Sequence, residues 1–431
     1  MRRSVIFCSL VSLVVLSLHA HAASTRRWIV DTTGDLLKGR GENVQVTPEG
    51  LLRGAPGWVA GPELEEPVVM AAAPMNDGRY AVGTSHPARL YAVSKEASEL
   101  LAEVPAEQIT AVLNEPSGAI LVATVAPAAV LRWSGGELVE VGSLDDGGLW
   151  DLAWFDGQVV AAGGTPATLY RLETRGLERW LELPDAHASC LAVSEDRLLV
   201  GTSEKGLILS VDANGGVAIL ANSPFTEIYD LVVGGGDVWA TALVGEPVAS
   251  TVKRSNGDDE DEDGEGSVEV EAEISGGADL DLPKVNGKTA TSEVLKLTPD
   301  GGLLSIHRFT NQVASSAAWD GEGLVIGTGY EGEVWRFVDD GGARIATVDA
   351  VQVVAVIAAG EAVLTQGPAA VMFRSGDQRP ARFRSATKRF RQPVKLGEFR
   401  VEPSVAGARI RFRSGTSATP DPTWLEWTQW Q

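Results

Sequence analysis

The chain has 431 residues, with 36 Lys and Arg against 58 Asp and Glu, so its formal net charge at pH 7 is −22. This acidity argues against non-specific nucleic-acid binding, which needs basic side chains that displace counterions from phosphates. The only cysteines are Cys8 and Cys190. Cys8 lies in an N-terminal region that we expect to be removed, so a disulfide framework and a cysteine-based zinc site are excluded.

The N-terminus has the three parts of a secretory signal. Basic Met1-Arg2-Arg3 precedes an apolar run from Val5 to Leu18, and Ala20-His21-Ala22 follows. This order predicts a signal peptide over 1–22, cleaved after Ala22, and a secreted or periplasmic protein. The alternative, a membrane anchor, is disfavoured because the run is short for a span of about 20 apolar residues. No later segment is long and apolar enough to span a membrane.

The stretch Ala188 to Asn222 reads as four short strands joined by tight turns. Apolar residues alternate with small or polar ones in its third run, Leu207 to Val211, which is the period of a half-buried strand. Asn214-Gly215 marks a hairpin, because this pair supplies the positive φ of primed turns. A single four-stranded meander cannot bury its apolar face, so it must stack against copies of itself.

A small pair at the end of the second strand recurs along the chain at spacings of roughly 38–40 residues, with one longer gap in the fifth unit. The pairs are Gly83-Thr84, Ala123-Thr124, Gly163-Gly164, Gly201-Thr202, Ala240-Thr241, Gly327-Thr328 and Leu364-Thr365. Four strands per unit at this period predict an all-β fold, a seven-bladed β-propeller over 23–376. The last unit lacks a clean fourth strand, and we predict that Glu42–Val46, with Leu51 and Leu52, supplies it and closes the ring.

The long gap predicts an insertion at about 245–290, between the second and third strands of blade 5. From Asp258 to Asp281 it holds twelve acidic residues and no basic one. Such a like-charge block repels itself, so we predict a disordered loop. Asp259, Asp261 and Asp263 resemble half of an EF-hand, but Val270 stands where a bidentate Glu belongs, which argues against a specific calcium site.

Residues 377–431 differ in character from the repeats. From Arg374 to the end there are twelve Lys and Arg against five Asp and Glu. Glu398–Val401 and Arg409–Arg413 read as strands, and Trp424, Trp427 and Trp430 follow. The segment is predicted either to pack on the propeller or to belong to an incomplete β-sandwich. Its basic residues fit a solvated edge strand or a surface that meets an anionic partner.

The candidate binding residues are defined by position. Residues just before each innermost strand should converge at the channel mouth on one face of a propeller, and ordinary loop residues are the alternative. These residues are Gln108, Trp150, His187, Glu227, Tyr229, Asn311 and Gln352. The three histidines after the signal, His86, His187 and His307, are isolated in sequence, and no catalytic or phosphate-binding motif occurs. We therefore predict no catalytic residue, no metal site and no cofactor.

One family resemblance follows from the repeat. Leu199-Val200-Gly201-Thr202-Ser203-x-x-Gly206-Leu207 resembles the W-I-G-T-x-x-G-L unit of two-component-regulator propellers, which are WD40-like. The resemblance covers Val68 to Arg374 and implies a secreted bacterial propeller, often followed by a small β-sandwich. The Trp-Asp and Gly-His marks of WD40 repeats and a kinase domain are missing from this chain.

The combined prediction is a monomeric, non-catalytic extracytoplasmic propeller that binds a protein, glycan or small-molecule ligand. Two alternatives remain open. One is a secreted hydrolase or lyase with its site at the channel mouth, and the other is the sensing module of an envelope signalling system. A bound metal, or buried carboxylates with shifted pKa values near the channel, would favour an enzyme.

Overall fold

The computed structural model describes residues 27–243 and 292–431, except 299–300, 311, 331, 339–340, 376–379, 391–394, 396, 402–406 and 418–419. It also describes two short paired strands, β23 (Lys284–Val285) and β24 (Lys288–Thr289). The signal peptide predicted at 1–22 therefore lies outside the described residues, as does the disordered loop predicted at 245–290 apart from β23 and β24. In the described part of the chain, no helix is long and apolar enough to cross a bilayer.

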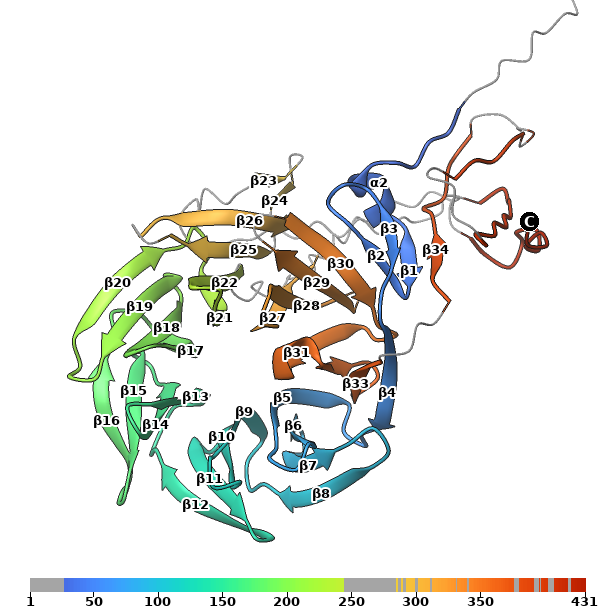
Figure 1. The fold of residues 1–431 in the computed structure, drawn as a ribbon. Helices are drawn as coiled ribbons and strands as arrows, with labels where there is room; N and C mark the ends of the chain where they lie inside the picture. The colour runs from blue at the N-terminus through green and yellow to red at the C-terminus, as the bar shows by residue number, and fades with distance from the viewer. Residues whose placement is uncertain are drawn as a thin grey trace, which may run out of the picture.

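The chain folds as an all-β propeller (Figure 1). Within the described residues the strands group into seven four-stranded antiparallel units, here called blades 1 to 7. Blades 1 and 2 are β5–β8 (Val68–Pro74, Tyr80–Ser85, Arg89–Val93, Ser98–Glu103) and β9–β12 (Gln108–Asn114, Ile120–Val125, Ala129–Ser134, Glu137–Ser143). Blades 3 and 4 are β13–β16 (Leu149–Phe155, Gln158–Gly163, Thr168–Glu173, Gly176–Glu182) and β17–β20 (His187–Ser194, Arg197–Ser203, Leu207–Asp212, Val217–Asn222).

The remaining blades include the two irregularities of the ring. Blade 5 is β21, β22, β25 and β26 (Glu227–Gly234, Asp237–Leu243, Ser292–Leu297, Leu303–Phe309). Blade 6 is β27–β30 (Ala314–Trp319, Leu324–Thr328, Glu333–Val338, Gly341–Thr347). Blade 7 is β31–β33 (Gln352–Ile357, Ala362–Gln366, Ala370–Ser375) with β4 (Gly57–Glu63) as its outer strand, and a short 3-10 helix, η1 (Ala358–Gly360), joins β31 to β32.

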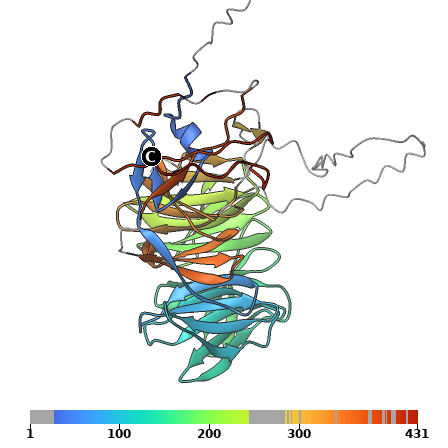
Figure 2. The same cartoon turned by 90° about the vertical axis from the view of Figure 1, so that its right-hand side faces the viewer.

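The first strand of each blade lies nearest the axis of the ring, and neighbouring inner strands contact one another all the way round, including β31 of blade 7 with β5 of blade 1. The side view shows the blades forming a disc, with the N-terminal and C-terminal segments at its rim (Figure 2). All inner strands run in the same direction, because every blade repeats the same antiparallel order. Their first residues therefore lie on one face, here called the axial face.

The recurring Gly-Thr pair has two physical roles. The Thr84 hydroxyl accepts from the Arg89 N–H (2.9 Å) and donates to the Pro87 carbonyl (2.8 Å), which closes the turn between the second and third strands. Thr124 makes both bonds, Thr202 and Thr328 accept from the N–H five residues on, and Thr365 donates to the Pro368 carbonyl. At Gly327 a Cβ atom would lie 2.4 Å from Val353 of the next inner strand, so glycine lets the blades approach closely.

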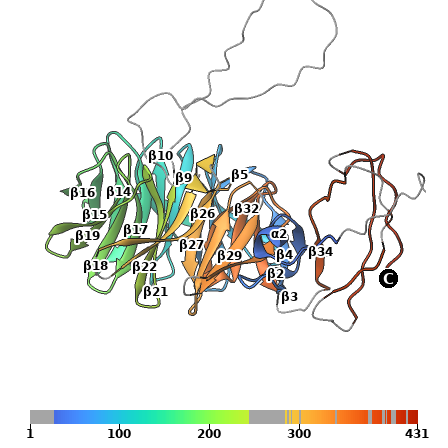
Figure 3. The same ribbon diagram turned by 90° about the horizontal axis from the view of Figure 1, so that it is seen from above.

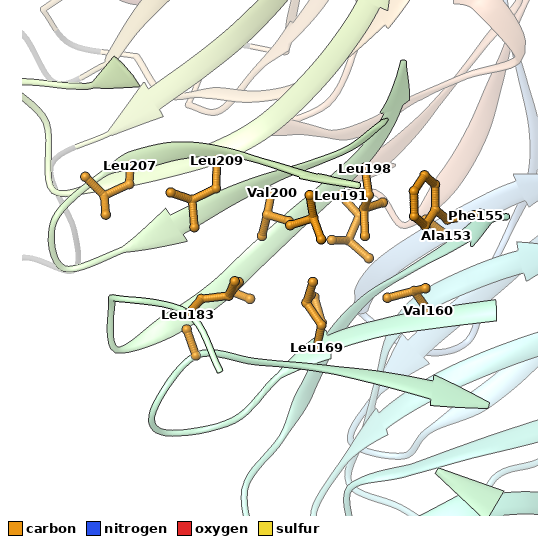
Figure 4. Packing of buried hydrophobic residues seen from close by; sticks show 14 residues of the cluster. Ala153, Phe155, Val160, Leu169, Leu183, Leu191, Leu198, Val200, Leu207 and Leu209 are labelled. Atoms are coloured by element: carbon orange, nitrogen blue, oxygen red, sulfur yellow. The ribbon is translucent and has the colours of Figure 1, made fainter. Parts of the chain in front are cut away.

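Among the residues that the structure describes, the core consists of seven clusters of buried side chains, and each cluster joins two neighbouring blades. Between blades 3 and 4, Phe155 and Leu169 face Leu198 and Val200 across the interface (Figure 4). A Leu or Val that is fully buried contributes about 1.5–3 kcal/mol. A blade gains this energy only when its neighbours are present, which explains why the repeats form a ring.

The strand that pairs with β33 of blade 7 is β4, and this differs from the sequence prediction. The predicted segment, Glu42–Val46 with Leu51 and Leu52, instead forms β2 (Val44–Val46) and the start of β3 (Leu52–Gly54). These two strands extend blade 6 beyond β30. The prediction was wrong because it passed over Gly57–Glu63, whose Gly, Pro and Trp residues break the apolar alternation of a typical strand.

A buried arginine anchors the N-terminal segment to blade 6. Arg344 pairs with Glu333, and its guanidinium also donates to the Leu37 and Gly39 carbonyls (3.3 and 2.9 Å) at the end of helix α2 (Thr33–Leu37). Beyond α2, β1 (Arg40–Glu42) pairs with β34 (Arg382–Arg384), so the two ends of the chain meet beside the ring (Figures 1 and 3). The segments predicted as strands at 398–401 and 409–413 are not regular β-strands among the described residues.

Candidate functional site

The axial face gathers the sequence-predicted site residues that the structure describes. Gln108, His187, Glu227 and Gln352 are the first residues of the inner strands β9, β17, β21 and β31. Trp150 is the second residue of β13, and Tyr229 is the third residue of β21. Asn311 lies outside the described residues. Gln108 and Gln352 come from blades 2 and 7, whereas the remaining residues come from the consecutive blades 3, 4 and 5.

Each inner strand carries a β-bulge close to its start. The register with the second strand shifts by one residue, which leaves one residue of the inner strand unpaired. The unpaired residues of blades 1 to 7 are Met70, Thr110, Trp150, Ser189, Tyr229, Ser315 and Val354. A bulge re-aims the side chain of its extra residue, and bulges are common beside functional sites. Because the seven positions are structurally equivalent, the types of residue that occupy them can be compared directly from blade to blade.

In three blades the bulge residue links one blade to the next. The Thr110 hydroxyl donates to the Leu149 carbonyl of blade 3 (2.6 Å). The Ser189 hydroxyl donates to the Ile228 carbonyl of blade 5 (2.7 Å). Ser315 donates in the same way to the carbonyl of Val353 in blade 7. A hydroxyl at this position therefore serves as an interblade clamp.

In blades 3 and 5 the link comes only from the residue after the bulge, a position from which Ser316 of blade 6 also accepts the Val356 N–H. Asp151 follows the bulge residue Trp150, and its carboxylate accepts from the backbone N–H of Leu191 in blade 4 (2.7 Å). Asp230 follows Tyr229 and accepts from the Ala317 N–H of blade 6 (2.8 Å). Because the carboxylates hold the neighbouring blades, the two aromatic side chains are not needed as clamps.

The two aromatic side chains are instead open to solvent. Trp150 is 37% exposed and Tyr229 is 42% exposed, which is unusual for large side chains on the inner strands of a ring. Between them, from blade 4, comes His187, whose ring meets the Trp150 ring edge-on at 6.5 Å between centroids. His187 Nδ1 lies 3.1 Å from the Gly164 carbonyl. A carbonyl only accepts, so Nδ1 carries the proton and Nε2 is the acceptor of the neutral imidazole.

The electrostatics of this site are dominated by the two clamp carboxylates. Burial raises the pKa of Asp151 to about 7, and the nearby charge of Asp230 adds to the rise, whereas N–H donors from Leu191 and Leu152 oppose it. Burial likewise raises the pKa of Asp230 to about 6. Although the Tyr229 side chain is 42% exposed, partial desolvation together with the charges of Glu227 and Asp230 raises the pKa of its phenol. The site is therefore acidic in character, with carboxylates that titrate close to neutral pH.

Cys190 occupies the position equivalent to these carboxylates in blade 4. Burial and then the charges of Asp230 and Asp151 raise the pKa of its thiol well above the ordinary value. The thiolate is the nucleophilic form, so this cysteine is an inert, buried side chain. Within the described ranges, no group of three or more His, Cys, Asp or Glu residues is arranged to hold a metal ion.

Asp151 and Asp230 were not among the residues predicted from the sequence, although the sequence carries a signal for them. Trp150-Asp151 and Tyr229-Asp230 place an aromatic residue and an aspartate at the same point of the repeat, two repeats apart. No other inner strand has this pair at its bulge. Comparing the repeats column by column would have separated these residues from ordinary loop carboxylates.

Comparison with known proteins bears on the fold. No protein-family model matches the chain, and no curated protein is similar in sequence. Among solved structures, virginiamycin B lyase from Staphylococcus aureus superposes with a TM-score of 0.53 at 10% identity, covering 74% of this chain and 98% of the lyase. The WD40 β-propeller domain of Doa1 gives 0.51 at 12% identity, covering 75% and 98%.

A third similar structure is larger than the propeller. The extracellular domain of a proposed one-component system from B. thetaiotaomicron gives a TM-score of 0.51 at 12% identity, covering 74% of this chain but 40% of that domain. All three are propellers, and at these identities the similarity shows the fold alone.

Proposed function

We propose that the protein is a non-catalytic binding propeller that acts outside the cytoplasm and takes a small-molecule or glycan ligand on its axial face. The ligand would contact Trp150 and Tyr229, with His187 between them. The observation that carries the proposal is the displaced clamp in blades 3 and 5. Where a bulge hydroxyl would suffice to join two blades, Asp151 and Asp230 do so instead, and an aromatic ring is left exposed.

The chemistry of the site suits a ligand with both apolar faces and hydrogen-bonding groups. Exposed aromatic rings supply contact area at little cost in conformational entropy, and the half-buried Gln108, Glu227 and Gln352 offer polar groups on the same face. The extracytoplasmic location rests on the predicted signal peptide. A role as the sensing module of an envelope system would use the same ligand site and would add a protein partner.

The test is a panel of glycans and metabolites, screened by thermal shift against the mature protein, followed by calorimetry on each hit. The Trp150→Ala and Tyr229→Ala variants should each weaken a hit by about 10- to 30-fold, the loss typical of a central aromatic contact. Ile219→Ala is the matched control, because Ile219 is a 61% exposed apolar side chain on the outer strand β20. A hit that both aromatic variants bind as tightly as the wild type would refute the proposed site.

A second candidate function is acid–base catalysis, such as that of a secreted hydrolase or lyase. It is favoured by the pKa values of about 7 and about 6 at Asp151 and Asp230, which suit proton transfer near neutral pH. Against it, both oxygens of each carboxylate already accept backbone N–H bonds. Turnover of a panel ligand that Asp230→Ser abolishes, while binding persists, would establish catalysis over binding alone.

A further inference from the structure

The C-terminal segment carries an alternating stack of arginine and tryptophan side chains. The stack, here called the Arg–Trp ladder, consists of Arg409, Arg411, Arg413, Trp424, Trp427 and Trp430. The guanidinium of Arg411 lies between two rings, 4.8 Å from the Trp427 centroid and 4.5 Å from the Trp430 centroid. Arg413 lies likewise between Trp427 (4.9 Å) and Trp424 (5.6 Å). The guanidinium of Arg409 lies 5.6 Å from the Trp430 centroid.

The hydrogen bonds between the two halves of the segment explain this interleaving. Ile410 exchanges backbone bonds with Gln431 (2.9 and 3.0 Å), Thr428 N–H donates to Phe412, and Leu425 N–H donates to Ser414 (2.9 Å each). Each step of two residues on the arginine side therefore matches three residues on the tryptophan side. The spacings Arg-x-Arg-x-Arg and Trp-x-x-Trp-x-x-Trp follow from that register, so one ring falls beside each gap between guanidiniums.

The ladder is joined to the propeller by one more cation–π contact. Arg384 of β34 lies 5.5 Å from the Trp427 centroid, and β34 pairs with β1, which follows the Arg344-anchored helix α2. Figure 3 shows this segment as a separate layer beside the ring, next to β34. The arginines are thus held in place by stacking rather than left as free side chains.

Asp421 is close enough to Arg413 to interact with it electrostatically, but the ladder contains no ion pair within the described part of the chain. There Arg409, Arg411 and Arg413 have no carboxylate within ion-pair distance, whereas Arg79, Arg89, Arg132, Arg336 and Arg344 all do. Burying a guanidinium face against an indole leaves its edge N–H donors free, because those donors lie in the guanidinium plane. Every second residue from 409 to 413 is an arginine, so the ladder presents a row of fork-shaped donors.

We propose that the Arg–Trp ladder binds a linear anionic polysaccharide, through bidentate contacts between its guanidinium edges and carboxylate or sulfate groups repeated along the polymer. Arginine is suited to such groups, because its planar fork matches two acceptor oxygens. The net charge of −22 makes the rest of the protein repel a polyanion, so the attraction is local to this row and screened within about 8 Å at physiological ionic strength.

The same geometry disfavours single-stranded nucleic acid. Proteins that bind it use free aromatic faces as platforms for the bases, and in the ladder Trp427 and Trp430 each lie close to at least two guanidiniums. A polysaccharide needs no such platform, because its recognition here depends on the repeated charged groups.

The test measures binding of the mature protein to a heparin oligosaccharide and an oligogalacturonate at about 150 mM salt, with neutral dextran as the uncharged comparison. Both acidic chains should bind and dextran should not. The double variant Arg411→Gln/Arg413→Gln should weaken binding at least about tenfold, because two charge-assisted contacts are lost. Arg179→Gln/Arg197→Gln, which changes two arginines on outer and second strands with acidic partners, should change it less than about twofold.

A Lys variant and two comparison ligands test the proposal even if the Gln substitutions disturb the fold of the segment. Arg411→Lys/Arg413→Lys keeps both charges but loses the planar forks, and it should still bind several-fold more weakly than the wild type. Wild-type affinity in the Lys variant would overturn recognition by stacked guanidiniums. Equal retention of dextran, or tighter Arg-dependent binding to an oligo-dT strand or to phosphatidylglycerol vesicles, would overturn the polysaccharide assignment. Trp150→Ala should leave polysaccharide binding unchanged, which separates this surface from the axial site.

Discussion

Replacing Asp151 by serine tests whether the buried carboxylate of an interblade clamp lowers stability at neutral pH. Serine removes the titrating group but keeps an acceptor for the Leu191 N–H, as Ser316 accepts from the Val356 N–H at 2.9 Å in blade 6. The substitution therefore separates the clamp from its charge.

The expected magnitude follows from the pKa. The carboxyl of Asp151 titrates at about 7 in the folded protein, against 3.8 when exposed. The folded state thus holds a proton that the unfolded state has lost between about pH 4 and pH 7, so stability falls as pH rises through that window. One pKa unit corresponds to about 1.4 kcal/mol, which gives about 4 kcal/mol at most and about 2–4 kcal/mol for a carboxyl that remains partly in contact with solvent.

The assay is urea unfolding of the wild type and Asp151→Ser at about pH 4.5 and pH 7.5. The quantity compared is the change in unfolding free energy between the two pH values, because contributions from other groups cancel between the proteins. Because the unfolded carboxyl is already mostly ionised at pH 4.5, the wild type should lose about 2–3 kcal/mol more than the variant between the two pH values. Asp145→Ser, at an exposed carboxylate in the connection between blades 2 and 3, should behave as the wild type. An equal pH response in wild type and Asp151→Ser, or a smaller loss in the wild type, would refute the reasoning.

Two other substitutions test parts of the scaffold. Burial among Phe309, Trp335 and Phe337 lowers the pKa of His307 to about 4, so its neutral form stabilises the fold above about pH 6.5 and that stability is lost as pH falls toward 4. His307→Phe should therefore reduce the acid sensitivity of unfolding by about 3 kcal/mol, measured by urea titration at pH 4 and pH 7, and an unchanged acid response would contradict this account. Gly327→Ala should destabilise by about 1–3 kcal/mol, because its Cβ would lie 2.4 Å from Val353, whereas Gly54→Ala, with no atom within 4 Å, should have almost no effect in the same thermal-unfolding experiment.

The sequence determined the repeat because its causes are local. A threonine that closes its own turn, an Asn-Gly hairpin and alternating apolar residues act within about ten residues of one another, so each blade can be read without its neighbours. The positions of the candidate site residues on one face followed from the same repetition, since every inner strand begins at the same face. Their role as a ligand site stays a proposal.

Tertiary structure decided what depends on partners that are distant in sequence. Which N-terminal segment pairs with β33 was set by docking on blades 6 and 7, where Arg344 fixes α2 and leaves Gly57–Glu63 free to pair. Asp151 acts as the clamp, and Trp150 beside it is the exposed ring. Only the tertiary structure decides this, because the N–H that Asp151 accepts belongs to Leu191 of the next blade. Likewise, tryptophans three apart and arginines two apart have unrelated periods in the sequence, and only the register between the two segments makes them one ladder. Bringing such distant segments together costs conformational entropy, which only the packing of the folded protein offsets. No local sequence pattern therefore encodes these hydrogen bonds and ring contacts.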